Sequence, residues 1–229
     1  MKLDLLAALN AERAARRAAI LVTDVESGAQ RLVREADAGA DPLAAVLEER
    51  FRSGKSGLVE AGGRPLFFTV QVPPTKILVV GAVHISQALV PMARGLDLDL
   101  AIVDPRTAFA TPERFPDVPV LAEWPDAALP RLGLDRYTGL LALTHDPKID
   151  DPALTLALRT ECFYIGALGS RKTHGSRVER LSQAGLPAEA IARIHAPIGL
   201  DIGAVSPAEI ALSILAEIVA TLRRDRRRA

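Results

Sequence analysis

The chain has 229 residues, and 28 basic side chains balance 28 acidic ones, so its overall charge gives no reason to expect a nucleic-acid partner. Hydrophobic residues make up 49% but aromatic residues only 4%, so the core must be built mainly from Ala, Leu, Ile and Val. A single cysteine, Cys162, excludes an internal disulfide, and no apolar stretch approaches the roughly 18 residues of a membrane span. Because the start also lacks a signal-peptide layout, these features predict a cytoplasmic protein.

The first third of the chain predicts a small α+β module. Its expected elements are a helix over 5–18, a hairpin of 19–25 and 30–34, a helix over 41–52, and a second hairpin of 58–60 and 65–72. Pro73-Pro74 follows, and two consecutive prolines form an extended, rigid segment. We therefore expect an N-terminal module over 1–74 and a second domain over 75–229.

From residue 76 onward, apolar runs alternate with helical patterns. Strands are expected at 76–80, 98–103, 118–120, 138–144 and 161–165, and helices at 84–94, 126–132, 151–160, 172–184, 187–193 and from 207. Such alternation implies right-handed crossovers and a parallel sheet. The predicted fold class is thus α/β, a Rossmann-like and mostly parallel sheet with helices on both faces, preceded by the small α+β module.

The first strand of this domain ends at Gly81, which opens a helical segment, and the second strand ends at Asp104. Strand, glycine turn, helix, strand and acid is the order of a dinucleotide-binding βαβ unit, in which a helix N-terminus favours an anion. The full fingerprint would place glycines at positions 83 and 86, where this chain has Val83 and Ser86. A valine side chain obstructs the close approach of a pyrophosphate, so the fold does not by itself predict NAD binding.

Polar and glycine residues follow the strands throughout the domain. In an open parallel sheet, ligands bind beyond the carboxyl ends of the strands, so these positions map the expected site. A second glycine turn, with Ser170 and two cations after it, predicts a phosphate or carboxylate pocket; the alternative is a tight turn whose cations lie in solvent. The predicted cofactor contacts are Gly81, Val83, His84, Asp104, Arg106, Thr144, His145, Asp146, Gly166, Gly169, Ser170, Arg171, Lys172, His195 and Asp201.

Two of these contacts allow more than one interpretation. His145 beside Asp146 is compatible with acid–base chemistry or metal ligation, but adjacent residues on an extended chain point apart and one pair is not a metal quartet. The loop from His195 to Gly203 is rich in apolar residues and glycine, so it is expected to pack inward and line a site, or to be a snug connector whose histidine bonds a carbonyl. We assign no catalytic residue and no metal site, and we expect Cys162 to be a structural thiol.

Several motifs in sequence order resemble the XdhC/CoxI family, whose members are accessory factors for molybdoenzymes of the xanthine dehydrogenase and carbon monoxide dehydrogenase type. The resemblance covers essentially all of 76–222. The motifs are Gly-Ala-Val-His-Ile-Ser-Gln-Ala-Leu (81–89), Val-Asp-Pro-Arg (103–106), Glu-Arg-Phe-Pro (113–116), Leu-Thr-His-Asp-Pro (143–147), Tyr-Ile-Gly-Ala-Leu-Gly-Ser-Arg (164–171) and Ile-His-Ala-Pro-Ile-Gly-Leu-Asp-Ile-Gly-Ala (194–204).

This resemblance implies that the protein binds molybdenum cofactor (molybdopterin), protects it during sulfuration and passes it to a xanthine-dehydrogenase-type molybdoenzyme. The implied partners are that client and a sulfur-donating enzyme, and a homodimer is expected because symmetric dimers are common. Family members often carry a Ser-Gly-Gly-Cys-Val-Glu type motif in the N-terminal domain. Residues 1–74 contain no cysteine, and Ser-Gly-Leu-Val-Glu at 56–60 is the nearest counterpart, which puts sulfur ligation by this module in doubt.

Three functions remain open on the sequence alone. The leading one is a cofactor carrier without turnover of its own. The second is an NAD(P)-dependent oxidoreductase in which Asp104 binds the adenosine ribose and His145 is the acid or base. The third is a nucleotide-binding scaffold that only docks a partner.

Overall fold

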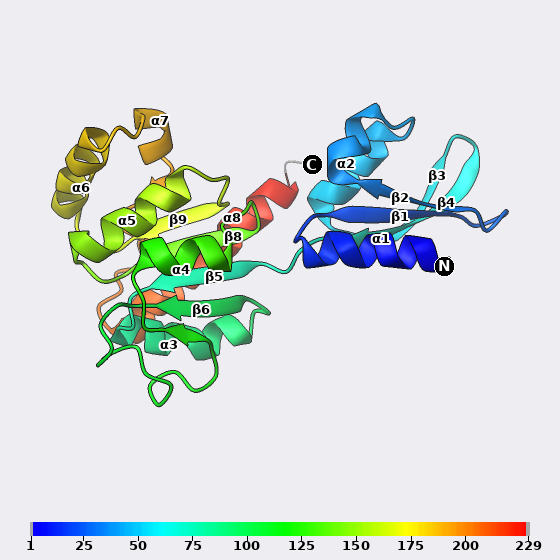
Figure 1. Ribbon diagram of the computed structural model, residues 1–229. Helices are drawn as coiled ribbons and strands as arrows, with labels where there is room; N and C mark the ends of the chain where they lie inside the picture. The colour runs from blue at the N-terminus through cyan, green and yellow to red at the C-terminus, as the bar shows by residue number, and fades with distance from the viewer. Residues whose placement is uncertain (1, 228–229) are drawn as a thin grey trace. The chain divides into compact units, whose positions relative to one another are not determined.

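The computed structural model describes residues 2–227, and side chains as far as Arg223 (Figure 1). The chain divides into two compact units. The first comprises residues up to Pro73 and the second comprises Pro74–Leu222. Each unit is described by itself. No helix in residues 2–227 combines the length and the apolar character needed to cross a membrane.

The N-terminal unit is an antiparallel sheet with helices packed on it. Its strands are β1 (Ala19–Asp24), β2 (Gln30–Arg34), β3 (Gly57–Ala61) and β4 (Arg64–Gln71), in the order β2-β1-β4-β3, and its helices are α1 (Leu3–Ala14), the 3-10 helix η1 (Glu35–Ala40) and α2 (Ala44–Ser53). Both predicted hairpins are present. Ile20, Leu47 and Phe68 are fully buried and form the centre of this small core.

Two helix boundaries in this unit differ from the prediction. The first helix ends at Ala14 instead of Ala18, because Arg16 takes a left-handed conformation with φ 51°. The second helix begins at Ala44 instead of Asp41, because the Asp41 carboxylate accepts a hydrogen bond from the Leu43 N–H and forms a turn first. On α1, buried Glu12 binds Arg17 and Arg34 at 2.6 and 2.8 Å, and their hydrogen bonds lower the pKa of Glu12 to about 2.

The C-terminal unit is a six-stranded parallel sheet with helices on both faces, as predicted. The strand order is β10-β9-β8-β5-β6-β7. The elements are β5 (Lys76–Val80), α3 (His84–Arg94), β6 (Asp99–Val103), β7 (Val120–Leu121), α4 (Pro125–Leu132), β8 (Thr138–Ala142), α5 (Pro147–Leu158), β9 (Tyr164–Ala167), α6 (Arg171–Gln183), α7 (Ala188–Ile191), β10 (Ile194–His195) and α8 (Pro207–Arg227). The chain leaves β5 toward β6 and later returns to β8 on the other side, so the topological switch point lies between β5 and β8.

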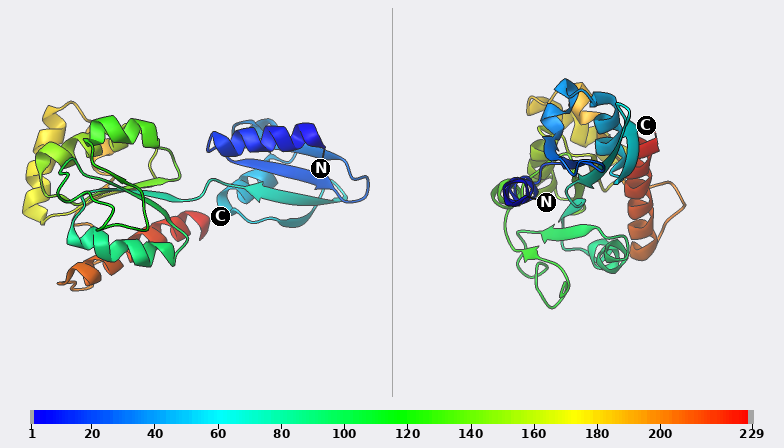
Figure 2. Two further views of the ribbon diagram at one scale, coloured as in Figure 1. Left: turned by 60° about the horizontal axis from the view of Figure 1, so that its bottom comes forward. Right: turned by 90° about the vertical axis from the view of Figure 1, so that its right-hand side faces the viewer.

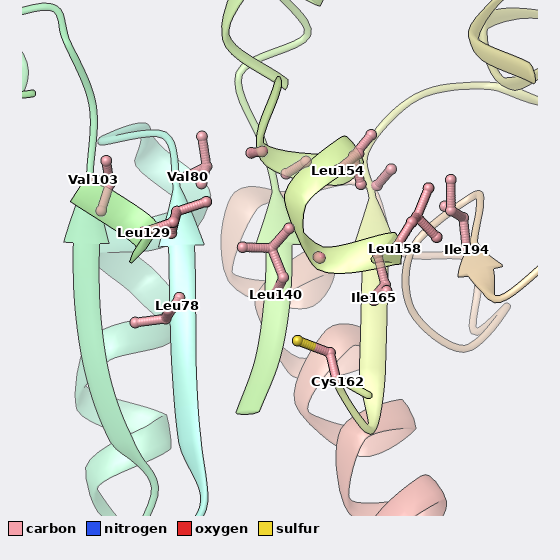
Figure 3. Packing of buried hydrophobic residues seen from close by; sticks show 14 of the residues in the cluster. Leu78, Val80, Val103, Leu129, Leu140, Leu154, Leu158, Cys162, Ile165 and Ile194 are labelled. Atoms are coloured by element: carbon pink, nitrogen blue, oxygen red, sulfur yellow. The ribbon is translucent and has the colours of Figure 1, made fainter. Parts of the chain in front are cut away.

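Alternate residues of each strand point to opposite faces of this sheet. Leu78 and Val80 pack with α4 and α5, whereas Ile77 and Val79 pack with α3 and α8. The left view of Figure 2 shows α4 and α5 on one side of the sheet and α3 and α8 on the other. In Figure 3, Cys162 lies among the buried side chains of the first face. Burial raises the pKa of this thiol, which fits the structural role expected of it.

Several elements of this unit differ from the prediction: among them, the strand expected at 138–144 ends at Ala142 and the helix expected at 187–193 covers only Ala188–Ile191. The strand expected at 161–165 runs over 164–167, that expected at 118–120 is only Val120–Leu121, and the two-residue β10 was not predicted. The helix expected from 151 begins at Pro147, because Asp146 caps it by accepting a hydrogen bond from the Lys148 N–H. At the start of α8, Ser206 and Glu209 form a capping box, with both reciprocal hydrogen bonds present.

Candidate functional site

The carboxyl ends of the parallel strands bring the predicted site residues to one edge of the sheet. Val80 pairs with Val103 and with Ala142, and Ala142 pairs with Ala167, so the ends of β6, β5, β8 and β9 are adjacent. His195 on β10 pairs with Gly166. The two glycine turns therefore lie on the same edge, separated by β8 alone.

Gly81 is required by the close approach of β8. It has φ 124°, and a Cβ there would lie 3.1 Å from Thr144 Cγ2 and 3.2 Å from the Leu143 carbonyl carbon. Its N–H donates to the Val103 carbonyl at 2.9 Å, and buried Ser86 donates its hydroxyl to the Gly81 carbonyl at 2.5 Å. The turn is thus held on both sides by the protein itself, and the glycine serves backbone packing.

Asp104 is fully buried and stabilises this turn. Its carboxylate accepts hydrogen bonds from the Ala82 N–H at 2.8 Å and from the Arg106 N–H, Nε and Nη2 at 2.9, 2.9 and 2.7 Å. Burial alone would raise the pKa of Asp104, but the bonds from Arg106 and Ala82 outweigh it and hold the pKa below its usual value. To bind a ribose hydroxyl, this carboxylate would have to give up bonds that hold the turn.

Arg114 supports the same turn and was not among the predicted contacts. Its Nη1 donates to the carbonyls of Ala82 and Phe109, each at 3.0 Å, and its Nη2 donates to Gln87 Oε1 at 3.1 Å. The guanidinium groups of Arg106 and Arg114 lie 4.7 and 5.5 Å from the centre of the Phe109 ring. The motif Glu-Arg-Phe-Pro at 113–116 was the available signal, but the contact itself spans 32 residues.

Three helices begin at this edge, and they differ in how their first turns are capped. Asp146 caps α5, and Ser170 caps α6 by accepting the Thr173 N–H at 3.2 Å. At α3 the capping position is Val83, which has extended backbone and offers no side-chain acceptor. The first-turn amides of α3 therefore carry the partial positive charge of a helix N-terminus with no side-chain cap.

His145 and Asp146 have separate roles in the structure. Asp146 serves as the helix cap, and His145 is exposed with φ 62°, an uncommon conformation for a residue with a side chain. Thr144 donates its hydroxyl to Asp150 at 2.7 Å, and the Asp146 N–H donates to the same hydroxyl at 3.0 Å. This network fixes the β8–α5 connection and leaves the His145 ring at the surface.

A hydrogen-bonded triad orients His195 at the end of β10. Glu217 on α8 accepts from the Tyr164 hydroxyl at 2.5 Å and from the Gly199 N–H at 2.9 Å, and its other oxygen lies 2.9 Å from His195 Nδ1. The rings of Tyr164 and His195 are 4.5 Å apart between centres. Burial would raise the pKa of Glu217, but the bonds from Tyr164 and His195 outweigh it and hold the pKa below its usual value. The histidine bonds a carboxylate instead of the carbonyl considered from the sequence.

The remaining predicted contacts fall into two groups. His84, Arg171, Lys172 and Asp201 are exposed, as the solvent interpretation of the two cations allowed. Gly166 is buried, and an added Cβ there would collide with the Ile198 side chain, which packs inward as expected for its loop. Across residues 2–227 no three His, Cys, Asp or Glu side chains gather in a way that could hold a metal ion.

Several known proteins are similar to part of this chain in sequence. The protein of the Escherichia coli K12 strain named uncharacterized protein YqeB is 33% identical over 69% of this chain and 29% of its own length. The molybdenum cofactor insertion chaperone PaoD of the same strain is 38% identical over 37% of this chain and 27% of its own. A Bacillus subtilis protein named as a probable xanthine dehydrogenase subunit is 28% identical over 66% of this chain and 44% of its own. The chain thus spans less than half the length of each of these relatives.

The fold is also found in a solved structure. A crystal structure described as a xanthine dehydrogenase from Bacillus halodurans matches 97% of this chain and 66% of that chain, with a TM-score of 0.67 and 22% identity, so the likeness is one of fold. Residues 77–218 match the family model described as the XdhC Rossmann domain. That match covers the whole edge built from Gly81, Asp104, Thr144, Gly169 and His195. The chain therefore belongs to the XdhC family.

Proposed function

We propose that this protein binds molybdenum cofactor at the carboxyl edge of its parallel sheet and delivers it to a molybdoenzyme of the xanthine dehydrogenase class. The observation that carries the proposal is the uncapped start of α3, which lies at the topological switch point beside the Gly81 turn. Among the relatives of the chain is a protein named as a molybdenum cofactor insertion chaperone, which supports the same role.

The residues at this edge fit the chemistry of the cofactor. Molybdopterin has a terminal phosphate and a flat pterin ring, so it needs an anion site and hydrogen-bonding groups for a heterocycle. The α3 amides offer the anion site because no acidic side chain competes for them. Val83 at the capping position has no acceptor, and the buried Asp104 binds the Ala82 N–H instead. His195, held by Glu217, and exposed His145 supply polar groups along the same edge. When bound, the cofactor would supply its molybdenum centre to the client; the protein's part is to hold and release it.

The oxidoreductase alternative loses its main residue in the structure. It requires Asp104 to bind a ribose, but this side chain has 0% exposure and its oxygens bind Ala82 and Arg106. Val83 also remains where the dinucleotide fingerprint has glycine. We therefore favour a carrier over an enzyme that uses NAD(P).

The proposal is tested by what the protein carries. Protein purified from a host that makes molybdenum cofactor should release a fluorescent pterin after oxidation, in an amount approaching one per chain. Loaded protein should activate a cofactor-free enzyme of the xanthine dehydrogenase class faster than free cofactor does. Protein that neither carries nor retains added cofactor would remove the basis of the proposal.

A further inference from the structure

A pocket at the N-terminal part of α5 and α6 is lined by buried polar side chains, some of whose atoms have no hydrogen-bond partner in the part of the chain that the structure describes. It has a volume of about 270 Å³, and its walls include His145, Asp150, Lys172 and Arg177. Asp150 and Arg177 are 1% and 2% exposed. Neither was among the contacts predicted from the sequence, and neither belongs to the uncapped start of α3.

The bonding of Asp150 is one-sided. Its Oδ1 accepts the Thr144 hydroxyl at 2.7 Å and the Thr144 N–H at 3.3 Å, whereas its Oδ2 has no hydrogen-bond partner within the described residues. A buried carboxylate oxygen without a partner is costly. Burial raises the pKa of Asp150, and the Thr144 donors, the charge of Arg177 and the His145 N–H act against that rise without cancelling it. The pocket therefore presents one free acceptor.

Arg177 is the matching donor. Its Nη2 donates to the Leu168 carbonyl at 2.8 Å, but its Nε and Nη1 have no partner within the described residues. Burial lowers the pKa of this guanidinium, and the charge of Asp150 acts against that shift. Two donor nitrogens of Arg177 and one oxygen of Asp150 are thus unpaired in two side chains that line the same pocket.

A ligand that binds both the Asp150 oxygen and the Arg177 nitrogens must match their charges and their hydrogen-bonding roles. Of the other charged groups in the lining, Arg180 is paired with Asp151 and Lys172 is exposed, so the buried charges are those of Asp150 and Arg177. A phosphate or carboxylate at this pair would bind Arg177 but meet the Asp150 oxygen, and a cation would bind Asp150 but meet Arg177. A neutral group that offers an N–H beside a C=O satisfies both residues at once. We propose that Asp150 and Arg177 bind the lactam edge, an N–H next to a C=O, of a flat heterocycle of the pterin or guanine type.

The choice of a pterin among such heterocycles rests on the proposed function. The volume of the pocket suits one ring system and not a whole dinucleotide, since sites for drug-sized ligands run from about 300 to 1,000 Å³. His145 lines the same pocket from a left-handed backbone position at the end of β8. The cofactor would then place its pterin edge between α5 and α6.

The test uses full-length protein and three probes: pterin, 3-methylpterin, in which a methyl group replaces the lactam hydrogen, and guanosine. Pterin fluorescence should report binding to the wild type, and 3-methylpterin should bind about tenfold or more weakly because it lacks the N–H donated to Asp150. Guanosine separates the two sources of a lactam: tighter binding of guanosine than of pterin would overturn the pterin assignment. Binding of inorganic phosphate in competition with pterin would show an oxyanion site and overturn the proposal.

Two substitutions test the residues themselves. In Asp150→Asn, the Thr144 donors keep the remaining oxygen, so an amide N–H₂ takes the place of the unpaired oxygen. In Arg177→Lys, the positive charge remains but the planar guanidinium with its several N–H donors is lost. Each should weaken pterin binding about tenfold or more, while Arg131→Lys, at an exposed ion pair with Glu123, should not change it. Thermal unfolding of both variants, compared with the wild type, checks that a loss of pterin binding is not a loss of the fold.

The outcomes for this pocket and for the proposed function are separable. Variants that bind pterin as the wild type does, or that carry molybdenum cofactor to the wild-type level, would overturn the pocket assignment and leave the carrier function standing. A wild type that carries no cofactor but binds pterin through Asp150 and Arg177 would overturn the function and keep the pocket.

Discussion

The turns after β5 and β9 have the same plan but present different surfaces to a ligand. Both contain a glycine with strongly positive φ, 124° at Gly81 and 130° at Gly169, and both lead into a helix at the same edge of the sheet. At α6, Ser170 already accepts a first-turn amide, whereas at α3 Val83 cannot. The turn that lacks the second and third fingerprint glycines, at Val83 and Ser86, is therefore the one whose helix start has no side-chain cap.

This difference shows that the residue at the N-cap decides, as much as the glycine does, whether the amides of a helix start are available to a ligand. A glycine brings the chain around, but an N-cap hydroxyl or carboxylate competes with any ligand for the same amides. After Gly81, Asp104 accepts the Ala82 N–H and Arg114 donates to the Ala82 carbonyl. These bonds hold the turn without occupying the first-turn amides of α3. Substitutions at the two turns can break or sharpen this contrast.

The largest effect is expected for Asp104→Asn. The amide N–H₂ would face the donors of Arg106, and either that contact or the Ala82 bond would be lost. Because Arg106 is about one-third exposed and can rehydrate, we expect a loss of about 2–3 kcal/mol of unfolding free energy, less than for a fully buried pair. Urea denaturation measures it, and Asp117→Asn, at an exposed carboxylate, should change stability by less than about 0.5 kcal/mol.

The same pair predicts a pH dependence. The pKa of Asp104 is lowered in the folded state, so its contribution is complete above the unfolded value of about 3.8 and is lost as the pH falls below it. The stability difference between wild type and Asp104→Asn should therefore shrink on acidification. A difference that stays constant down to the acid unfolding of the wild type would contradict the assigned ion pair.

Gly81→Ala is expected to be the next most damaging change. The new Cβ would require both an unfavourable φ and a shift of Thr144, which costs about 1–3 kcal/mol and moves the start of α3. The matched control is Gly175→Ala inside α6, where no atom lies within 4 Å of the added Cβ and stability should rise by up to about 1 kcal/mol. Thermal unfolding and cofactor content should both fall for the first variant and not for the second.

The sequence predicts the alternation of strands and helices well because burial on both faces leaves continuous apolar runs such as 76–80. It also predicts that Gly81, Asp104, Thr144 and Gly169 share an edge, since that follows from parallel topology alone. Boundaries such as the start of α5 were wrong by a few residues, although the Asp146-Pro147 capping signal was present in the sequence.

The contacts that decide the chemistry could not be predicted in the same way. Whether Asp104 faces a ligand or its own turn depends on Arg106 reaching back to it, and Glu217 meets His195 only after α8 packs on the sheet. Asp150 and Arg177, which have atoms without a hydrogen-bond partner among the described residues, lie on two different helices and are 27 positions apart in the sequence. Such tertiary arrangements leave no local pattern to read.

Ser170→Ala should have a moderate effect that is confined to the capped turn. Removing an N-cap hydroxyl costs about 1 kcal/mol, and here it frees the Thr173 N–H. We expect a small fall in unfolding free energy with cofactor content unchanged, because this helix start is not the one assigned to the anion. A large loss of cofactor in this variant would instead place the anion at α6.

Val83→Thr should have the smallest effect on stability. It tests the difference between the two turns most directly, because it gives α3 the side-chain cap that α6 already has. The substitution nearly keeps the shape of this half-buried side chain, and the backbone at position 83, with φ −104° and ψ 174°, already suits an N-cap. The new hydroxyl can accept a first-turn amide of α3, so stability should change by less than about 1 kcal/mol while retained cofactor falls. Val59→Thr, at another half-buried valine inside strand β3, controls for adding a hydroxyl and should leave cofactor retention unchanged. If Val83→Thr retained as much cofactor as the wild type, the α3 amides would not hold the anion. Both glycine turns would then have a structural role only.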